Sequence, residues 1–550
     1  MFAKTLEKLL CSQSALSRAR SLLCAAVVAS ATGTARPTPR GCVYLYDMWF
    51  QHNLKVSLRR NKPLCGVLSR HSLMKLLSIR LSPQAGKSLV MRGSAHIDLL
   101  ATLLKRFSQL LVVVMCSSTA IAYATPNIQH WQSASGAKVL FVEDHDIPML
   151  DVAVTVQAGS SFDVADKSGV AGLTHQMLDS GAEGLSEDEI SRGMADIGAQ
   201  FGGGFDPDRS SITLRTLSSA AERDKALDIM ARVLQHPVFP EAVLAREKVR
   251  LVAALKESDT KPENIAERAF QKAVFGTHPY ALRGSGEVET VEKLTVQDLR
   301  DFYGAHYQAA HAVVAIMGDA TRAQAEAIAQ QLTAQLPSSS TPSALPKVAM
   351  KIAASEQRIS HPASQSHILI GAPGMARNDP DFFPLYVGNY TLGGGGFVSR
   401  LMNEVREKKG LAYSVYSYFM PLKQPVASQI GLQTKKEQAD EALQLARSTL
   451  DDFIAEGPTE KELLAAKQNI IGGFPLRIDS NRKILDYLSV IGFYDLPLTY
   501  LDDFTRNIEQ VTVAQIRGAF ARHIDPQAMA TVIVGAPEGV AKGAAEGTAK

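Results

Sequence analysis

One segment of the sequence carries side chains that could bind a metal ion. His175 and Asp179 lie four residues apart in the segment 169–181, GVAGLTHQMLDSG, and Glu183 follows closely. On a helix, residues four apart share a face, so this imidazole and carboxylate could hold a cation together. Polar pairs at this spacing are also common on helix surfaces, and two ligands hold zinc weakly. The segment is therefore open to two interpretations, a solvated helix face or a metal site made by His175, Asp179 and Glu183.

A second pair of residues could stabilise negative charge. Arg406 and Tyr413 lie seven residues apart in REKKGLAY. A guanidinium and a phenol both donate hydrogen bonds, which suits an oxyanion that develops during a reaction. The alternative is that Arg406 is an ordinary cation on a helix surface and that Tyr413 is a strand residue in the core.

Three further segments have simpler interpretations. The run Gly393–Gly396 is not followed by Lys-Ser/Thr, so it predicts a tight strand-to-helix turn with positive φ rather than a phosphate loop. The run Gly202–Gly204 predicts a bend in a strand. The acidic stretch around His145 predicts a solvated hairpin turn.

The elements that position these residues follow from hydrophobic periodicity. A helical stripe of Val170, Leu173, Met177 and Leu178 predicts a helix that ends near Gly181. Branched residues in 139–142 and 150–156 predict strands, and apolar spacings of three and four in 221–234 and 241–255 predict helices. Strands grouped before and after helical blocks favour an α+β fold.

The body of the chain is duplicated. Residues 294–300 (LTVQDLR) match 511–517 (VTVAQIR) at an offset of 217, and His306 and Gly318 match His523 and Gly535 at the same offset. The Pro/Ser-rich segment 337–348 predicts a linker. We therefore predict two homologous domains, 125–336 and 349–540, followed by a tail, 541–550. Each domain is expected to be a mostly antiparallel sheet with helices packed on one face.

Charge and cysteine distribution separate a leader from this body. Residues 1–124 hold 17 basic and 3 acidic side chains and all five cysteines, whereas the remaining residues hold 41 basic and 52 acidic ones. An acidic body argues against binding to nucleic acid. Residues 91–124 resemble a signal peptide cleaved after Ala124, with an apolar run too short for a stable membrane span. This predicts a periplasmic or secreted protein. Residues 1–90 are interpreted as a mis-called or disordered leader, and its arginine-rich composition leaves a mitochondrial location as the alternative.

Residues 130–540 resemble the pitrilysin/insulinase-type (inverzincin) zinc metallopeptidases of the two-domain bacterial type. The resemblance is carried by the helix at 169–181, by 278–281 (HPYA) and by 401–413 (LMNEVREKKGLAY). It implies two domains that face each other as a half clam-shell. It also implies that Arg406 and Tyr413 bind substrate, and that a peptide is added near 202–204 to a sheet edge.

The zinc site of the family is not conserved in this sequence. The family motif H-x-x-E-H falls on Gly172, His175 and Gln176, and the third ligand, seven residues after Glu247, falls on Ala254. Zinc needs three donor side chains and an open water position, which glycine and alanine cannot supply. We therefore expect this chain to bind no metal and to use no cofactor of its own.

Three functions remain open. The first is a non-catalytic, substrate-binding subunit that completes the site of a homologous H-x-x-E-H partner, with zinc in the partner and a peptide or unfolded polypeptide as substrate. The second is a catalytically silent structural or peptide-binding homologue. The third is a stand-alone metalloendopeptidase with a rearranged metal site.

Overall fold

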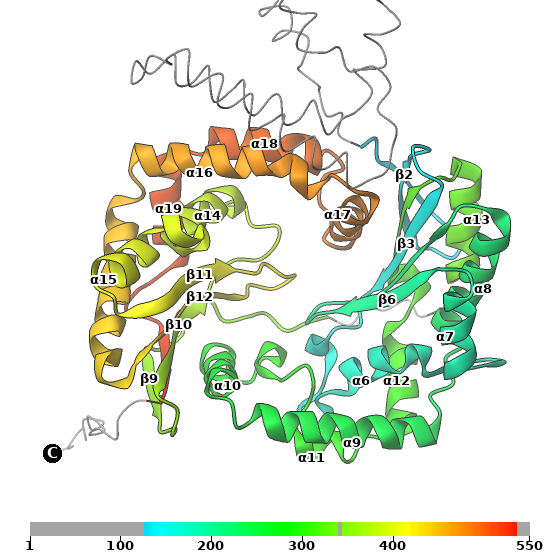
Figure 1. Cartoon of the computed structure of the whole chain (residues 1–550), viewed down its shortest axis with the longest axis horizontal. Helices are drawn as coiled ribbons and strands as arrows, with labels where there is room; N and C mark the ends of the chain where they lie inside the picture. The colour runs from blue at the N-terminus through cyan, green and yellow to red at the C-terminus, as the bar shows by residue number, and fades with distance from the viewer. Residues whose placement is uncertain (1–125, 339–343, 536–550) are drawn as a thin grey trace, which may run out of the picture. The chain divides into compact units, whose positions relative to one another are not determined.

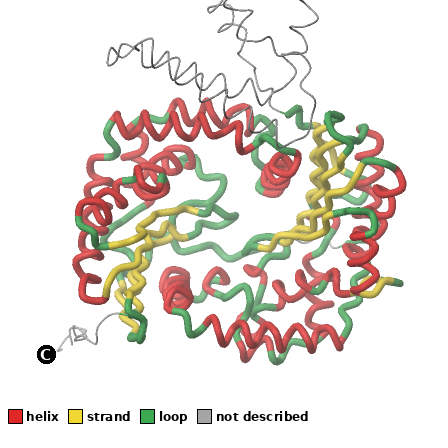
Figure 2. The backbone as a smooth tube through the Cα atoms, in the orientation of Figure 1, coloured by secondary structure: helices red, strands yellow, loops and turns green. Residues whose placement is uncertain are grey.

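The computed structural model describes residues 126–338 and 344–535. The proposed leader, signal peptide and tail lie outside the described residues, as does the centre of the linker. Figure 2 shows two groups of strands, each with its own helices. Within residues 126–338 and 344–535, no helix has the length and apolar character needed to cross a membrane.

The first half contains a six-stranded sheet in the order β1-β2-β8-β3-β7-β6, in which only β2 and β8 run parallel. Its strands are β1 (Gln129–Gln132), β2 (Lys138–Glu143), β3 (Met149–Val156), β6 (Gln200–Phe205), β7 (Ser210–Leu217) and β8 (Val313–Gly318), and a small separate sheet pairs β4 (Gly181–Ala182) with β5 (Leu185–Ser186). Its helices are α6 (Val170–Gln176), α7 (Glu187–Ala195), α8 (Ala220–Gln235), α9 (Glu241–Ser258), α10 (Pro262–Phe275), α11 (Val288–Val291), α12 (Val296–His306) and α13 (Arg322–Thr333).

The second half contains a five-stranded sheet in the order β11-β12-β10-β13-β9, in which only β13 and β9 run parallel. Its strands are β9 (Ser355–Ile359), β10 (Gln365–Pro373), β11 (Ala412–Phe419), β12 (Ala427–Lys435) and β13 (Ala530–Val534). Its helices are α14 (Phe382–Asn389), α15 (Ala439–Glu456), α16 (Glu460–Gly473), α17 (Asn481–Phe493), α18 (Tyr500–Gln510) and α19 (Val513–His523), with π-helical turns η6 (Tyr390–Gly394) and η8 (Met402–Lys408).

The structure confirms the predicted α+β class, and the two matched segments are structurally equivalent. The segments 294–300 and 511–517 both begin helices, α12 and α19, and both are capped by a threonine, Thr295 or Thr512. Each threonine accepts from the backbone N–H three residues on, whose own side chain bonds back. The duplication therefore extends to the way these helices start.

Each sheet also receives one helix from the other half. Phe270 of α10 is fully buried in a cluster with strand residues of the second sheet, and α17 packs on β3 and β8 of the first (Figure 1). Gly492 of α17 makes this close approach possible, because a Cβ there would lie 2.4 Å from Val313 Cγ1. The offset of 217 residues between the two copies makes α17 the counterpart of α10. Each half therefore packs the equivalent helix on the sheet of the other half.

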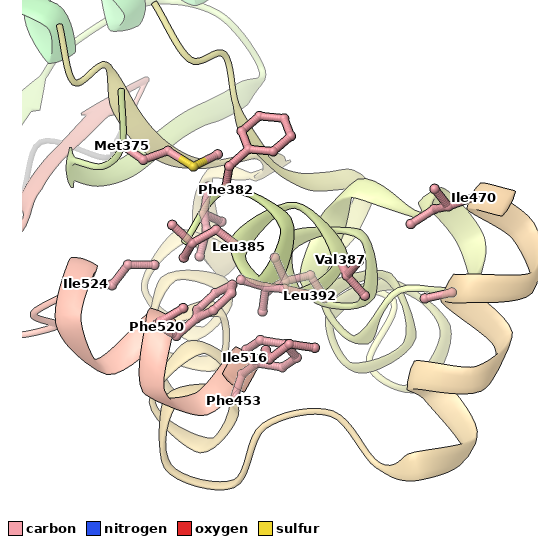
Figure 3. Close-up of a cluster of buried hydrophobic side chains, with 14 of the residues drawn as sticks. Met375, Phe382, Leu385, Val387, Leu392, Phe453, Ile470, Ile516, Phe520 and Ile524 are labelled. Atoms are coloured by element: carbon pink, nitrogen blue, oxygen red, sulfur yellow. The ribbon is translucent and has the colours of Figure 1, made fainter. Parts of the chain in front are cut away.

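The core of the second half lies between its sheet and its own helices. Figure 3 shows side chains of α14 and α19, including Leu385 and Phe520, packed together. Phe453 of α15 meets Phe520 edge-to-face at 4.9 Å between ring centroids. The fold is thus held by two sheet–helix cores and by the two exchanged helices.

The prediction of a hairpin at His145 was wrong. β2 and β3 flank the chain there, but both pair with β8, which lies between them in the sheet. The connection therefore crosses the end of β8, where His145 Nδ1 lies 2.6 Å from Asp319 Oδ1. The sequence alone could not show this, because β8 comes about 170 residues later.

Candidate functional site

Helix α6, which carries the degenerate zinc motif, is positioned by a buried carboxylate. Asp163 accepts hydrogen bonds from Gly169 N at 2.7 Å and from Ala171 N at 2.9 Å. These are N–H groups at the start of the helix, which have no partner within it. The predicted stripe of Val170, Leu173, Met177 and Leu178 is buried beneath, although α6 itself ends at Gln176 and continues as a short 3₁₀ turn.

Helices α6 and α9 are joined by a hydrogen bond between Gln176 and Glu247. Gln176 Nε2 donates to Glu247 Oε2 at 3.0 Å, and the buried Glu247 also pairs with Arg246 and Arg250. Ala254 lies about two turns further along α9 and is exposed. The amide of Gln176 is therefore already bound to a carboxylate, and the third-ligand position has no donor atom.

The space at Gly172 is closed by the backbone of another segment. A Cβ at this position would lie 2.7 Å from the carbonyl oxygen of Gly284. No histidine fits there unless the segment around Gly284 moves. The residues of this chain at the family's zinc positions do not fit the metal, both in donor chemistry and in space.

His175 is held inside the first half rather than offered to a substrate. Its Nδ1 lies 2.7 Å from Ser210 Oγ, which also accepts from the buried Tyr307 hydroxyl at 2.9 Å. Its ring stacks on Phe205 of β6 with 5.6 Å between centroids. Burial lowers the pKa of His175 to about 4, so the imidazole is neutral near neutral pH.

The structure does not bring His175, Asp179 and Glu183 together. Glu183 is exposed and lies 3.9 Å from His236. Among the residues described, the group of three that could hold a metal is instead Asp379, Asp381 and His523. Asp381 already has a counter-charge, because Arg522 forms two hydrogen bonds to it at 2.9 and 2.7 Å.

A cavity of about 470 Å³ lies where the two halves meet, beside the degenerate motif. From the first half it is lined by Gly172, Gln176, Phe205 and Tyr280, and from the second by Tyr418, Met420 and Leu422. The lining is mainly apolar, with a few amide and hydroxyl groups and the carboxylate of Asp206, which is paired with Arg209. Such a cavity suits an apolar side chain rather than hydrolytic chemistry.

A buried carboxylate joins the halves next to this cavity. Asp208 of the first half is 1% exposed and accepts from Tyr280 Oη at 2.7 Å, Tyr494 Oη at 3.0 Å and Lys423 N at 2.6 Å. Tyr494 and Lys423 belong to the second half. Sequence reasoning missed this contact, because nothing near Asp208 indicates partners more than 200 residues away. We refer to Asp208, Tyr280 and Tyr494 as the interdomain clasp.

Arg406 and Tyr413 lie together on the surface of the second half. The guanidinium of Arg406 is 5.0 Å from the Tyr413 ring centroid and 4.7 Å from that of Phe397, in cation–π contact with both. Tyr413 is 80% exposed, so the alternative of a core position for it is wrong. Neither residue lines the cavity.

The run Gly393–Gly396 differs from its predicted conformation. Gly393 and Gly394 end a π-helical turn that continues α14, so the run joins helical turns rather than a strand and a helix, and only Gly396 has a positive φ, +61°. A Cβ at Gly393 would lie 2.3 Å from Ser417 N of β11. Gly202–Gly204 lie in β6, an edge strand, and nothing stands within 4 Å of a Cβ at Gly202.

The fold and the α6–α9 pairing define a metallopeptidase-like chain whose metal positions are unsuited to zinc. Family models match both halves: "Insulinase (Peptidase family M16)" over residues 138–285 and "Peptidase M16 inactive domain" over residues 293–470. The chain belongs to peptidase family M16.

Known proteins of this family resemble most of the described chain. The crystal structure of a peptidase M16 inactive domain from Pseudomonas fluorescens is 38% identical, with a TM-score of 0.72, covering 75% of this chain and 98% of that one. The non-peptidase homolog YmxG of Helicobacter pylori is 26% identical over 72% of this chain and 91% of that protein. The uncharacterized zinc protease YmxG of Bacillus subtilis is 23% identical over 71% and 94%.

Proposed function

We propose that this chain is the non-catalytic, substrate-binding subunit of a two-chain zinc metallopeptidase that processes or degrades peptides. The observation that carries the proposal is the closed position at Gly172, together with the missing donor at Ala254 and the occupied amide of Gln176. The names of two relatives, a non-peptidase homolog and an inactive domain, support the non-catalytic part of the proposal.

This chain would contribute binding groups to the pair. The free edge of β6 offers backbone N–H and C=O groups to which an extended peptide can add as a further strand. Tyr413 is exposed and Arg406 is half-buried beside it, and both are donors able to bind a substrate carbonyl or an oxyanion in the partner's site. Zinc and the general base would come from an H-x-x-E-H partner.

Co-expression with such a partner tests the proposal. We expect the two chains to co-purify and to cleave an unfolded protein in a chelator-sensitive way, while this chain alone has no activity. Arg406→Ala should lower activity of the pair at least ten-fold, because one transition-state hydrogen bond is lost. Arg482→Ala, which removes an exposed arginine elsewhere in the second half, is the control. Unchanged activity in Arg406→Ala would refute the shared site.

A silent peptide-binding homologue is the second candidate, and the cavity favours it. Both walls of the cavity come from this one chain, so capture of a peptide needs no partner. If the isolated chain binds peptides and no H-x-x-E-H chain occurs in the same extract, the silent homologue is favoured over the two-chain peptidase. The rearranged metal site has no such support, because its three residues are not brought together.

We also propose that the mature chain begins at Thr125 and is periplasmic or secreted. The support is the A-x-A sequence at Ala122–Ala124 after a short apolar run. Sequencing the amino terminus of the native protein tests this directly. A terminus within residues 1–90 would favour the mitochondrial alternative.

A further inference from the structure

The outer edge of the second sheet has no neighbouring strand. β9 ends this sheet, and among the residues described only β13 pairs with it (Figure 1). Residues 355–358 are exposed. Ser355 N donates to Met529 O, next to β13, so the backbone groups of Ser355 face that strand. Because strand residues alternate, the N–H and C=O groups of Glu356 and Arg358 point away from β13 and towards solvent.

The duplication shows which strand of the first half is the counterpart of β9. Ser355 of β9 pairs with Ala530, and Lys138 of β2 pairs with Val313, in parallel ladders. The two pairs are related by the same offset of 217 residues that the sequence shows. In the first half, β1 pairs antiparallel with the outer edge of β2. The equivalent edge of β2 is therefore covered, whereas that of β9 is open.

The second half has no counterpart of β1. The same offset places it at residues 346–349, which form no strand and begin with Pro346. Proline cannot donate to a ladder. Val348 in this segment is instead buried in the cluster that contains Phe270 of α10. The chain itself thus supplies no antiparallel neighbour to β9 from this segment.

The exposed side of β9 is complementary to itself in charge. Glu356 and Arg358 lie on one face of the strand, with Arg358 Nε 2.8 Å from Glu356 Oε1. If two β9 strands pair antiparallel about Gln357, each Glu356 lies opposite Arg358 of the second copy. Both members of such a pair have outward backbone groups, so they can exchange two hydrogen bonds.

The neighbouring registers are disfavoured. Pairing about Glu356 would place two glutamates opposite each other, and pairing about Arg358 would place two arginines opposite each other, which destabilises a cross-strand pair. The outward backbone groups allow only these three ways of pairing along the strand. The register about Gln357 is therefore the one that charge selects.

The face of β9 that meets α10 has room for a further strand. Helix α10 packs on β10 and β13. A cavity of about 570 Å³ lies between α10 and β9, lined by Gln357 and Ile359 from the strand and by Arg268 and Lys272 from the helix. Residues directly opposite on antiparallel strands face the same side. Gln357 of a second copy would therefore lie at the mouth of this cavity, beside the Gln357 already there.

We propose that two copies of this chain associate through their β9 strands, which pair antiparallel and join the two second-half sheets. The arrangement has two-fold symmetry, so both copies use the same surface and the pairing closes on itself. Glu356 and Arg358 of the two copies form a square of alternating charges. The second copy supplies to β9 what β1 supplies to β2. The inference goes beyond the proposed function and does not depend on it, because it uses neither β6 nor the pair Arg406 and Tyr413.

Charge reversal tests the interface and its register. A short edge makes a small interface, so sedimentation velocity of the full chain should show a reversible monomer–dimer equilibrium at micromolar concentrations. Glu356→Arg creates two arginine–arginine pairs and Arg358→Glu creates two glutamate–glutamate pairs. Each variant alone should dimerise roughly ten-fold more weakly. Mixed in equal amounts, the two variants should dimerise with each other, because every charge then faces its opposite again.

Two further variants are controls. Arg192→Glu reverses an exposed arginine on α7 and should leave dimerisation unchanged. The double variant Glu356→Arg, Arg358→Glu restores opposite charges within each dimer and should recover most of the association. Far-UV circular dichroism checks that each variant is folded. Recovery in the mixture cannot come from a loss of fold, since both chains in it are single variants.

The opposite outcomes are equally clear. A chain that stays monomeric at every concentration overturns the inference, and would mean that the charges protect the edge of β9 from pairing. Dimerisation that the single reversals leave unchanged, or variants that do not associate when mixed, would place the interface elsewhere and also overturn it. None of these results bears on the proposed function, which is tested with the H-x-x-E-H partner and Arg406→Ala.

Discussion

Gly172 shows how one residue decides both chemistry and packing. A hydrogen atom there offers no ligand, and the carbonyl of Gly284 fills the space where a side chain would begin. Alignment of the segment with the family motif was enough to predict from the sequence that this ligand is missing. The closure could not be predicted, because the helical pattern of 169–181 contains no information about the segment at 284.

Gly172→Ala should destabilise the fold by about 1–3 kcal/mol, because the added Cβ collides with backbone that must shift. The measurement is the free energy of unfolding in urea. Gly202→Ala is the control, since a Cβ there meets nothing within 4 Å, and we expect less than about 1 kcal/mol of change. Equal stability of the two variants would show that the Gly284 segment yields easily.

His175 makes stability depend on pH. Burial lowers its pKa to about 4 from 6.5. Below about pH 6.5 the unfolded chain takes up a proton that the folded chain refuses until about pH 4. The stability contributed by the neutral imidazole is therefore complete above pH 6.5 and lost as the pH falls towards 4, by about 3 kcal/mol.

The prediction is that His175→Gln flattens the decline in unfolding free energy between pH 6.5 and 4. Part of the decline remains, because burial also lowers the pKa of His306 to about 4. His145→Gln is a control of opposite sign: its hydrogen bond to Asp319 raises the pKa of His145, so its contribution is present at acid pH and lost as the pH rises. If the unfolding free energy of His175→Gln falls with pH as steeply as that of the unmodified chain, the lowered pKa of His175 is contradicted.

At the scale of elements, the sequence predicted the helices better than it predicted which sheet each helix packs on. The constant offset between 294–300 and 511–517 indicated a duplicated unit, and the structure places a threonine-capped helix at both segments. The helices around 221–234 and 241–255 also appear close to their predicted bounds. Periodicity shows that a helix has an apolar face but not which sheet covers it, so the exchange of α10 and α17 could not be foreseen.

The exchanged helices should make the halves unfold together. Phe270→Ala on α10 removes a fully buried ring from the second sheet and should cost about 3–5 kcal/mol. Fluorescence of Trp131, in β1 of the first sheet, should report the same shift of the urea midpoint as far-UV circular dichroism. The other tryptophan, Trp49, precedes the proposed mature start at Thr125, so a full-length chain is measured in a Trp49→Phe background.

Phe453→Ala provides the comparison for the same experiment. Phe453 is fully buried within the second half, where it packs on Phe520 of α19. If the halves form one cooperative unit, its loss also moves the Trp131 midpoint. A circular dichroism midpoint that shifts while Trp131 fluorescence does not would show that the halves unfold independently.

At the scale of the whole described molecule, the cavity beside Gly172 and the interdomain clasp share a residue. Tyr280 belongs to the clasp and also lines this cavity. Desolvation raises the pKa of Asp208, and three hydrogen bonds, two of them from the second half, offset this rise only in part. A buried carboxylate that loses such partners is costly, so the clasp fixes how the two walls of the cavity face each other.

Asp208→Ala should therefore loosen the junction of the halves beyond its effect on overall stability. We expect a loss of about 2–4 kcal/mol, because two hydroxyls and one backbone N–H lose their acceptor. Asp163→Ala is the matched control: this aspartate is also buried and accepts two N–H bonds, but only within the first half. Amide hydrogen exchange in 262–275 and 481–493, compared at equal unfolding free energy, should rise only in Asp208→Ala. Equal exchange in the two variants would mean that the exchanged helices hold the halves together without the clasp.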